Sequence, residues 1–461
     1  MEKIYKSKFY LLVISIIIFA FWFVCMLAQN GKIKTEYYLT IESIELTAIG
    51  AAAFIVLVTS NNLFYVIPWI TYTPFVFSHP FTSTTMPYAL FIAGGLLFIG
   101  IIVHLIKYKI KLTLGAFFLG LLLLGIAIVL GGINTGADFL KQQIPFTIVA
   151  AAGLIIIYII FVSGTDVDFR MLCHLMNCLG LLLSLQVIAS FYFLEDYFSF
   201  LINKIIDVGW GISNNIAIML LVSIPCSIYL AIKSTYLKTS FYTVVAYLQT
   251  VIVVLTYSRG AVAALAVGGS ILLIVSIWLA FKNSLKTAIP YLLTILVLVG
   301  LSAFGLYLFL TSENEQVMVY ADGFKENITK INLDSLNGRD PIYEHCMEEF
   351  KLNPIFGKGL YSPFFDNEFT GGYQWGHSTV IHTLYTMGSV GGVALGIHFI
   401  QKYLNLLIKP NTEKIIAVFS FAISGLYGLV DVSYYFINYM IVFIMYLICL
   451  QKTVKASFDL L

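Results

Sequence analysis

The side chains best suited to chemistry lie between residues 338 and 392, in a chain that is otherwise almost entirely apolar. Arg339 stands at the start of a polar segment with helical spacing, and His377 opens the next long apolar run. A histidine exchanges its proton near neutral pH, and ionisable residues at a membrane boundary usually have a functional reason. The pattern predicts a site for a substrate that is partly lipid and partly water-soluble.

Two arginines and a histidine are the main candidates. Arg259, in the run TYSRGAVAALAVGG, is expected at the outer end of an apolar span, where its planar guanidinium suits a diphosphate. Its alternative role is to extend towards lipid phosphates, and Arg339 could equally be a solvated loop residue. His377 is the candidate general base, and a structural role is its alternative. His382 could equally be a buried histidine, and His345 is a weaker candidate for the base.

Four further residues have side chains that suit a sugar. Asn214 and Asn215 open an apolar span, where they act either as hydrogen-bonding groups for sugar hydroxyls or as a helix cap. Tyr373 and Trp375, just before His377, are either a stacking platform for a sugar ring or aromatic residues of the membrane interface.

Other kinds of chemistry lack a motif. The sequence has no GxxxxGK[ST], HExxH or GxSxG, which gives no support to ATP-driven transport, zinc proteolysis or serine hydrolysis. The six cysteines form no CxxC pair, and no carboxylates show a clear metal-binding spacing. We therefore expect neither a metal nor a cofactor, and nothing points to nucleic acid.

The elements that must position these residues are membrane helices. Hydrophobic residues make up 60% of the 461 residues and charged residues 11%, which predicts an all-α polytopic membrane protein of about 12 to 14 transmembrane helices. The segment 62–79 is the weakest, because Pro68 and Pro74 interrupt it, and we expect it to be kinked or re-entrant. The fourteen segments are 9–28, 41–59, 62–79, 87–107, 112–131, 144–163, 168–194, 212–232, 239–256, 259–281, 287–310, 377–401, 413–430 and 434–451.

The distribution of charge predicts the orientation. With both termini inside, the cytoplasmic side holds 16 of the 26 basic residues and 5 of the 24 acidic ones, as the preference of basic residues for that side requires. We expect the first segment to be a retained helix rather than a signal peptide. The loops 132–143, 195–211 and 311–376 then face outwards, and the last is by far the largest.

The chain divides accordingly into a transmembrane bundle (1–310), a large extracytoplasmic loop (311–376) and C-terminal spans (377–461). Within the loop, residues 334–354 predict a short amphipathic helix that Asp340 caps, with Pro341 at its first position. Ile342, Cys346 and Phe350 share one side of it, which suits packing across the mouth of the bundle. A lid or plug without chemistry is the alternative.

Several separate segments together resemble the O-antigen ligase and polysaccharide polymerase superfamily of bacterial envelopes, whose members transfer glycans from undecaprenyl-pyrophosphate. The resemblance covers roughly residues 200 to 400. It implies a membrane glycosyltransferase of the GT-C type, with the essential histidine at His377 and essential arginines at Arg259 and Arg339. The matching pieces are Trp210-Gly211 with Asn214-Asn215; Ser258-Arg259-Gly260; Gly338-Arg339; Asn353-Pro354-Ile355-Phe356-Gly357-Lys358-Gly359; and His377 with Gly388, Gly391 and Gly392. One departure is Ser378, where the family often has asparagine.

The residues and the resemblance lead to one functional expectation. The protein is expected to polymerise undecaprenyl-pyrophosphate-linked repeat units into O-antigen or capsular polysaccharide on the outer face of the bacterial cytoplasmic membrane, without metal and with inversion. His377 is the expected base, and Arg259 and Arg339 are the expected diphosphate ligands. The expected partners are the lipid-linked donor and acceptor, the bilayer and a possible chain-length regulator.

Three alternatives stay open. A ligase would transfer the finished glycan to lipid A core or to protein. A transporter of lipid-linked sugars would show charges near the midplane and two related halves, neither of which is visible in the sequence. A non-catalytic scaffold would leave the positions of the arginines and His377 unexplained.

Overall fold

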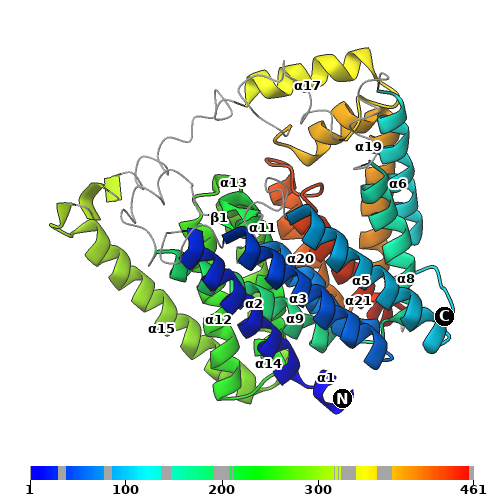
Figure 1. Ribbon diagram of the computed structural model, residues 1–461. Coiled ribbons are helices and arrows are strands. Elements are labelled where there is room, and N and C mark those ends of the chain that lie inside the picture. Colours follow the sequence, from blue (N-terminus) through cyan, green and yellow to red (C-terminus); the bar gives the residue numbers. More distant parts are fainter. Residues whose placement is uncertain are drawn as a thin grey trace. The chain divides into compact units, whose positions relative to one another are not determined.

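The computed structural model describes residues 2–29, 38–76, 86–135, 147–191, 207–209, 211–315, 317–319, 321–322, 339–360 and 376–455 (Figure 1). These residues are helical apart from loops and one short antiparallel pair, β1 (Asp207–Val208) and β2 (Gly211–Ile212), in which Asp207 faces Ile212. The predicted all-α fold is confirmed, and the β pair is a feature that the sequence did not reveal.

Within the described residues, ten helices are long and apolar enough to cross a membrane, and two more apolar helices are shorter. The chain is therefore a multi-pass membrane protein, while the exact number of spans stays a prediction. Eight of the ten are α2 (Lys8–Gln29), α3 (Tyr38–Thr59), α5 (Met86–Lys107), α9 (Phe169–Ser190), α11 (Ser213–Ile232), α12 (Leu237–Leu255), α15 (Leu285–Leu310) and α19 (Thr379–Leu407).

The other two long helices each contain a π-helical turn. The span Thr147–Gly164 includes η4 (Gly153–Ile157) and α8 (Tyr158–Gly164). The span Arg259–Asn283 consists of α13 (Arg259–Ala264), η6 (Leu265–Gly269) and α14 (Ser270–Asn283). The shorter apolar helices belong to α6 (Phe118–Ile133) and α21 (Ile437–Cys449), and α20 (Thr412–Gly428) precedes α21.

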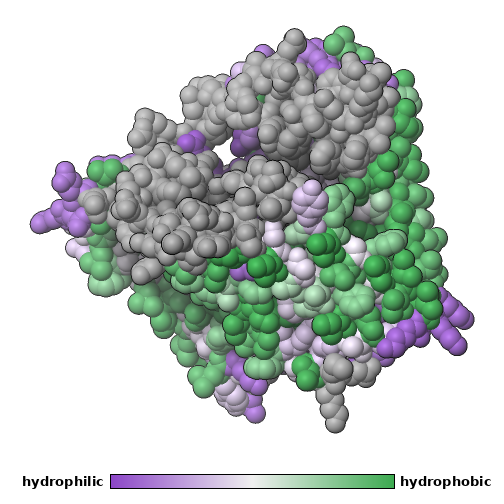
Figure 2. Space-filling model, in the orientation of Figure 1, coloured by the Kyte–Doolittle hydropathy of each residue, from purple (hydrophilic) through white to green (hydrophobic). Residues whose placement is uncertain are grey.

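Apolar side chains on the outside of the helices indicate contact with lipid. Along α15, large hydrophobic residues such as Leu296, Val297 and Phe304 are exposed. Figure 2 shows hydrophobic residues over much of the visible sides of the helices and hydrophilic residues at their ends. Such a surface is unfavourable in water and suits the hydrocarbon of a bilayer.

The weak segment 62–79 is interrupted as predicted. In its described part it forms three short helices, η2 (Leu63–Val66), α4 (Ile67–Tyr72) and η3 (Thr73–Phe75). Pro68 and Pro74 lie in the first turns of α4 and η3, where a missing N–H is tolerated. The prolines therefore divide this buried segment rather than ending it.

The helices gather into two compact units. The first comprises residues 1–110, 164–329 and 419–423, in which α3 packs on α5 and α11 packs on α9 and α12. The second comprises residues 111–163, 330–418 and 424–461, in which α19 packs on α6 and on α17 (Asp340–Leu352). These units do not follow the order of the chain, and the division into a bundle, a loop and C-terminal spans stays a prediction.

Helix α17 is the short amphipathic helix expected in the large loop. Its residues Ile342 and Cys346 are buried against Tyr385 and Ile381 of α19, so the predicted packing face is confirmed for these two positions. The predicted cap is wrong by one residue, because Arg339 occupies the N-cap position and Asp340 is the first helical residue. The Asp340 carboxylate in the first turn still favours the positive end of the helix dipole.

Candidate active site

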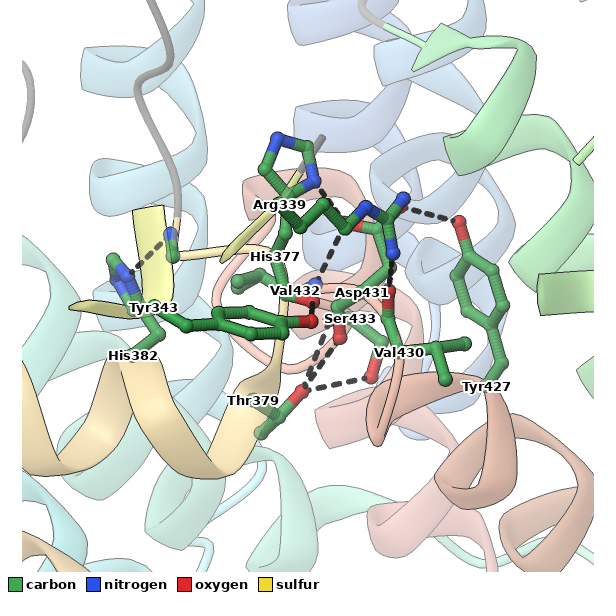
Figure 3. A network of polar contacts seen from close by, with 11 residues as sticks. Arg339, Tyr343, His377, Thr379, His382, Tyr427, Val430, Asp431, Val432 and Ser433 are labelled. Carbon is green, nitrogen blue, oxygen red and sulfur yellow. Dashed lines mark hydrogen bonds and ion pairs between the residues drawn. The ribbon is translucent and has the colours of Figure 1, made fainter. Parts of the chain in front are cut away.

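A buried aspartate lies at the centre of a polar network in the second unit (Figure 3). Asp431 follows α20, and only 3% of its side chain is exposed. Its two oxygens each accept a hydrogen bond: the Tyr427 hydroxyl donates to Oδ2 at 2.9 Å and the Val432 backbone N–H to Oδ1 at 2.8 Å. A buried carboxylate needs such partners, and it finds them within its own turn.

His377 points its imidazole at this carboxylate. Nδ1 of His377 lies 3.3 Å from Oδ1 of Asp431, and 19% of the His377 side chain is exposed. The backbone of His377 has φ +44°, a left-handed conformation that is uncommon for a residue other than glycine. The Tyr343 hydroxyl of α17 donates a 2.9 Å hydrogen bond to the His377 carbonyl oxygen. The surrounding contacts therefore hold an uncommon backbone that directs the ring towards Asp431.

Arg339 approaches the same carboxylate from the start of α17. One terminal nitrogen lies 3.8 Å from Oδ2 of Asp431, and the other donates to the Val430 carbonyl oxygen. The Arg339 side chain is 26% exposed, so it also faces outwards. Two residues predicted from sequence, His377 and Arg339, are thus brought together by a third.

The charges in this network favour an ionised aspartate. Burial by itself raises the pKa of Asp431, but the hydrogen bond and charge of His377, the Arg339 guanidinium and the Tyr427 hydroxyl together lower it below its ordinary value. A carboxylate facing Nδ1 favours the tautomer with the proton on that nitrogen, which leaves Nε2 able to accept a proton. The arrangement can therefore support general-base chemistry.

The first turn of α19 holds the aspartate segment in place. Thr379 Oγ1 donates to the Asp431 carbonyl oxygen at 3.3 Å and accepts from the Ser433 N–H at 3.2 Å. Ser378 takes the N-cap position of α19 without a capping hydrogen bond from its side chain. The contacts of Thr379 therefore fix the distance between the two segments that carry His377 and Asp431.

The other two candidate histidines, His382 and His345, lie in different surroundings from His377. His382 is fully buried, and its Nδ1 accepts a 3.3 Å hydrogen bond from the Gly376 N–H, which confirms the interpretation as a buried histidine. The His345 ring lies beside that of Tyr385, with 6.1 Å between their centroids. His377, by contrast, lies within ion-pair distance of the Asp431 carboxylate.

The remaining candidates of the described chain belong to the first unit. Arg259 is half-buried at the start of α13, directly after Ser258 and after Tyr257, whose φ is +52°. Asn214 and Asn215 lie in the first turn of α11, and Oδ1 of Asn215 is buried with no hydrogen-bond partner within the described residues. Because His377 and Arg339 belong to the second unit, a site shared with these three residues stays a prediction.

The two aromatic candidates, Tyr373 and Trp375, fall outside the described residues. Their predicted stacking role therefore stays a prediction.

The residues of the network that sequence reasoning missed include Asp431, Tyr427 and Tyr343. Asp431 carried a usable signal, because it is an acidic residue between two apolar segments, 413–430 and 434–451. An acid at such a boundary requires a partner or a function. The two tyrosines carried no comparable signal in a chain with 29 tyrosines.

Comparison with known proteins finds a family that matches one region of the chain. Residues 244–396 match a family model described as O-antigen ligase. The match confirms the resemblance stated from the short motifs, and it supports an enzyme of the ligase or polymerase type. None of the curated proteins compared with the chain matches it. The matched range contains Arg259, Arg339 and His377 but ends before Asp431.

Proposed function

We propose that the chain polymerises lipid-linked oligosaccharide repeat units, and the match of residues 244–396 to a family model described as O-antigen ligase supports this proposal. The donor is an undecaprenyl-pyrophosphate-linked glycan, and the acceptor is a hydroxyl of a second lipid-linked unit. The observation that carries this proposal is the approach of His377 and Arg339 to one buried carboxylate, Asp431.

The proposed reaction is a single displacement at the anomeric carbon. Nε2 of His377 accepts the proton of the acceptor hydroxyl as the hydroxyl oxygen forms its bond to that carbon. The bond between the anomeric carbon and the phosphate oxygen breaks, and the diphosphate leaves with the electron pair. Direct displacement inverts the anomeric configuration. Asp431 stabilises the imidazolium that forms, because its carboxylate lies 3.3 Å from Nδ1.

Arg339 is the proposed ligand of the departing diphosphate. A guanidinium has five N–H groups, so the contacts of Arg339 with Asp431 and the Val430 carbonyl leave donors for phosphate oxygens. Positive charge directed at the leaving group lowers the barrier as negative charge develops. Arg259 is proposed as the second diphosphate ligand, on the basis of its residue type and its place in the matched range.

Sugar recognition is proposed for Asn214, Asn215, Tyr373 and Trp375. The buried Oδ1 of Asn215, which lacks a partner within the described chain, supports a role as acceptor for a sugar hydroxyl. The bias of basic residues supports an extracytoplasmic site on the cytoplasmic membrane, since His377 and Asp431 then lie on the outer side.

The test uses purified protein in lipid with a lipid-linked oligosaccharide and a chelator of divalent metal. Wild type should form a ladder of longer products, and His377→Ala and Arg339→Ala should reduce the rate by at least about 100-fold. Lys351→Ala, which changes an exposed residue of α17, is the matched control and should act as wild type. Full activity in folded His377→Ala would exclude this residue as the base.

Ligation is the second candidate, because the matching family model is described as O-antigen ligase. A null strain separates the two functions on a glycolipid gel. A single repeat unit on the core indicates a lost polymerase, whereas bare core with accumulated lipid-linked polymer indicates a lost ligase. Absence of transfer with any acceptor would favour transport instead.

A further inference from the structure

Helix α19 is broken at a single glycine. Gly388 has φ +62° and ψ −159°, which no α-helix contains. A break of this kind removes hydrogen bonds from the helix ladder around it. Because unsatisfied backbone groups are costly in a buried or membrane setting, other donors and acceptors must replace those bonds.

The turn 354–359, which follows α17, supplies the replacements. Four backbone hydrogen bonds of 2.8–3.1 Å join it to the broken part of α19, and they run in both directions. Two N–H groups of the turn donate to carbonyls before the break, and two N–H groups after the break donate to carbonyls of the turn. The pairs are Lys358 N–H with Tyr385 O, Gly359 N–H with Thr386 O, Ser389 N–H with Pro354 O, and Val390 N–H with Ile355 O.

Glycine is required where the two backbones meet. Gly357 has φ +69°, and a Cβ built on it would lie 2.6 Å from the Gly388 nitrogen. A Cβ on Gly388 would lie 2.7 Å from the Phe356 nitrogen. Both neighbours are backbone atoms, so they cannot give way as a flexible side chain can. Any side chain at either position therefore separates the turn from α19.

The C-terminal end of α6 contacts both the turn and the broken part of α19. The Asn134 amide donates to the Gly357 carbonyl oxygen at 2.8 Å. A Cβ on Gly131 would lie 2.6 Å from the Thr386 oxygen, so this glycine allows α6 to approach the break. The turn is also joined to α17, because Lys358 Nζ lies 3.0 Å from the Glu349 carboxylate.

The turn and the site lie at opposite ends of the same helix. Arg339 precedes α17 and the turn follows it, about 20 Å apart at 1.5 Å per residue. Between these two ends, Ile342 and Cys346 of α17 pack against Tyr385 of α19 in a buried hydrophobic cluster. Because this cluster involves the first half of the 13-residue α17, the orientation of the helix also depends on how its C-terminal end is held.

We propose that the turn 354–359 and residues 385–390 of α19 form a backbone clasp that positions Arg339 against His377. The clasp holds the C-terminal end of α17 on α19, and the network around Asp431 then receives both Arg339 and Tyr343 at the other end. The inference deepens the proposed function and rests on it, since the reaction requires Arg339 beside His377. It assigns Gly357 and Gly388 a positioning role without contact to substrate.

The first measurement follows a native thiol. Cys346 is completely buried on the face of α17 that packs against α19, so separation of α17 from α19 exposes it to maleimide. Maleimide should label Cys346 at least about tenfold faster in Gly357→Ala and in Gly388→Ala than in wild type. Gly396→Ala is the control, since it lies in α19 and its Cβ would meet no atom within 4 Å. Cys226, buried in α11 of the other unit, should stay unlabelled in all variants.

A milder variant excludes general unfolding as the cause. Asn134→Ala removes one donor to the turn and introduces no clash, and it should increase Cys346 labelling about fivefold, as the loss of one hydrogen bond implies. If Cys226 also becomes labelled in a glycine variant, that variant is unfolded. The Asn134→Ala variant then decides whether the clasp exists. Labelling of Cys346 at the wild-type rate in Asn134→Ala and in the folded glycine variants would overturn the clasp.

The second measurement is the transfer reaction itself. Displaced Arg339 should raise the KM for the lipid-linked donor about tenfold or more and lower kcat, whereas a smaller folded fraction would lower the rate at unchanged KM. A wild type without transferase activity would refute the proposed function, while the Cys346 labelling would still test the clasp. An active wild type with equally active Gly388→Ala would overturn the positioning role alone.

Discussion

The substitution Asp431→Asn tests the centre of the proposed site. It preserves the size of the side chain but removes its charge and one of its two acceptor oxygens. At present Oδ2 accepts from Tyr427 and faces Arg339, while Oδ1 accepts from Val432 and faces His377. An asparagine can satisfy only one of these oxygen positions, so its amide NH₂ must face either the guanidinium or the imidazole.

The expected loss in kcat is about 10²–10⁴-fold. General-base catalysis by a positioned side chain contributes about that much, and without the carboxylate His377 loses the partner that orients its tautomer and stabilises its charged form. This corresponds to roughly 3–5 kcal/mol of transition-state stabilisation. Because Asp431 is buried, bulk water does not replace the missing charge as it would at the surface.

The assay is ladder formation from a lipid-linked oligosaccharide, with kcat measured at saturating donor. Glu348→Gln, which removes an exposed negative charge from α17, is the matched control and should retain wild-type kcat. Thermal unfolding of each variant shows that the rates compare folded proteins. Folded Asp431→Asn with a kcat within about threefold of wild type would refute the coupling of Asp431 to His377, provided that His377→Ala is inactive.

Three further outcomes are expected. Tyr343→Phe removes the hydroxyl bonded to the His377 carbonyl and should reduce kcat about fivefold, the value of one hydrogen bond, in the same ladder assay. Arg259→Ala should raise the KM for the lipid-linked donor about tenfold; an unchanged KM and kcat would remove Arg259 as a diphosphate ligand. Because the folded pKa of Asp431 is lowered from 3.8, its contribution to stability is present above that pH and is lost as the pH falls through the folded pKa. Thermal unfolding followed as the pH falls below about 4 should therefore show a steeper acid loss in wild type than in Asp431→Asn.

Local sequence properties determined the class of the protein and the residue types of the site. Hydropathy and the charge bias depend on neighbouring residues, so the apolar segments, the interrupted segment around Pro68 and Pro74, and the helix after Arg339 could all be predicted. His377 and Arg339 stood out because charged and titratable groups are rare in such a chain. The cap of α17 was misplaced because Asp340 also suits the first helical turn.

Tertiary structure alone decided which residues meet. Asp431 lies 54 residues after His377, and the turn 354–359 meets α19 about 30 residues further along the chain, so no local pattern connects these segments. The sequence shows the glycines but not that Gly357 and Gly388 must face one another with backbone against backbone. A buried carboxylate and a broken helix are tolerated only when distant partners satisfy them, and the fold is what brings those partners within hydrogen-bonding distance.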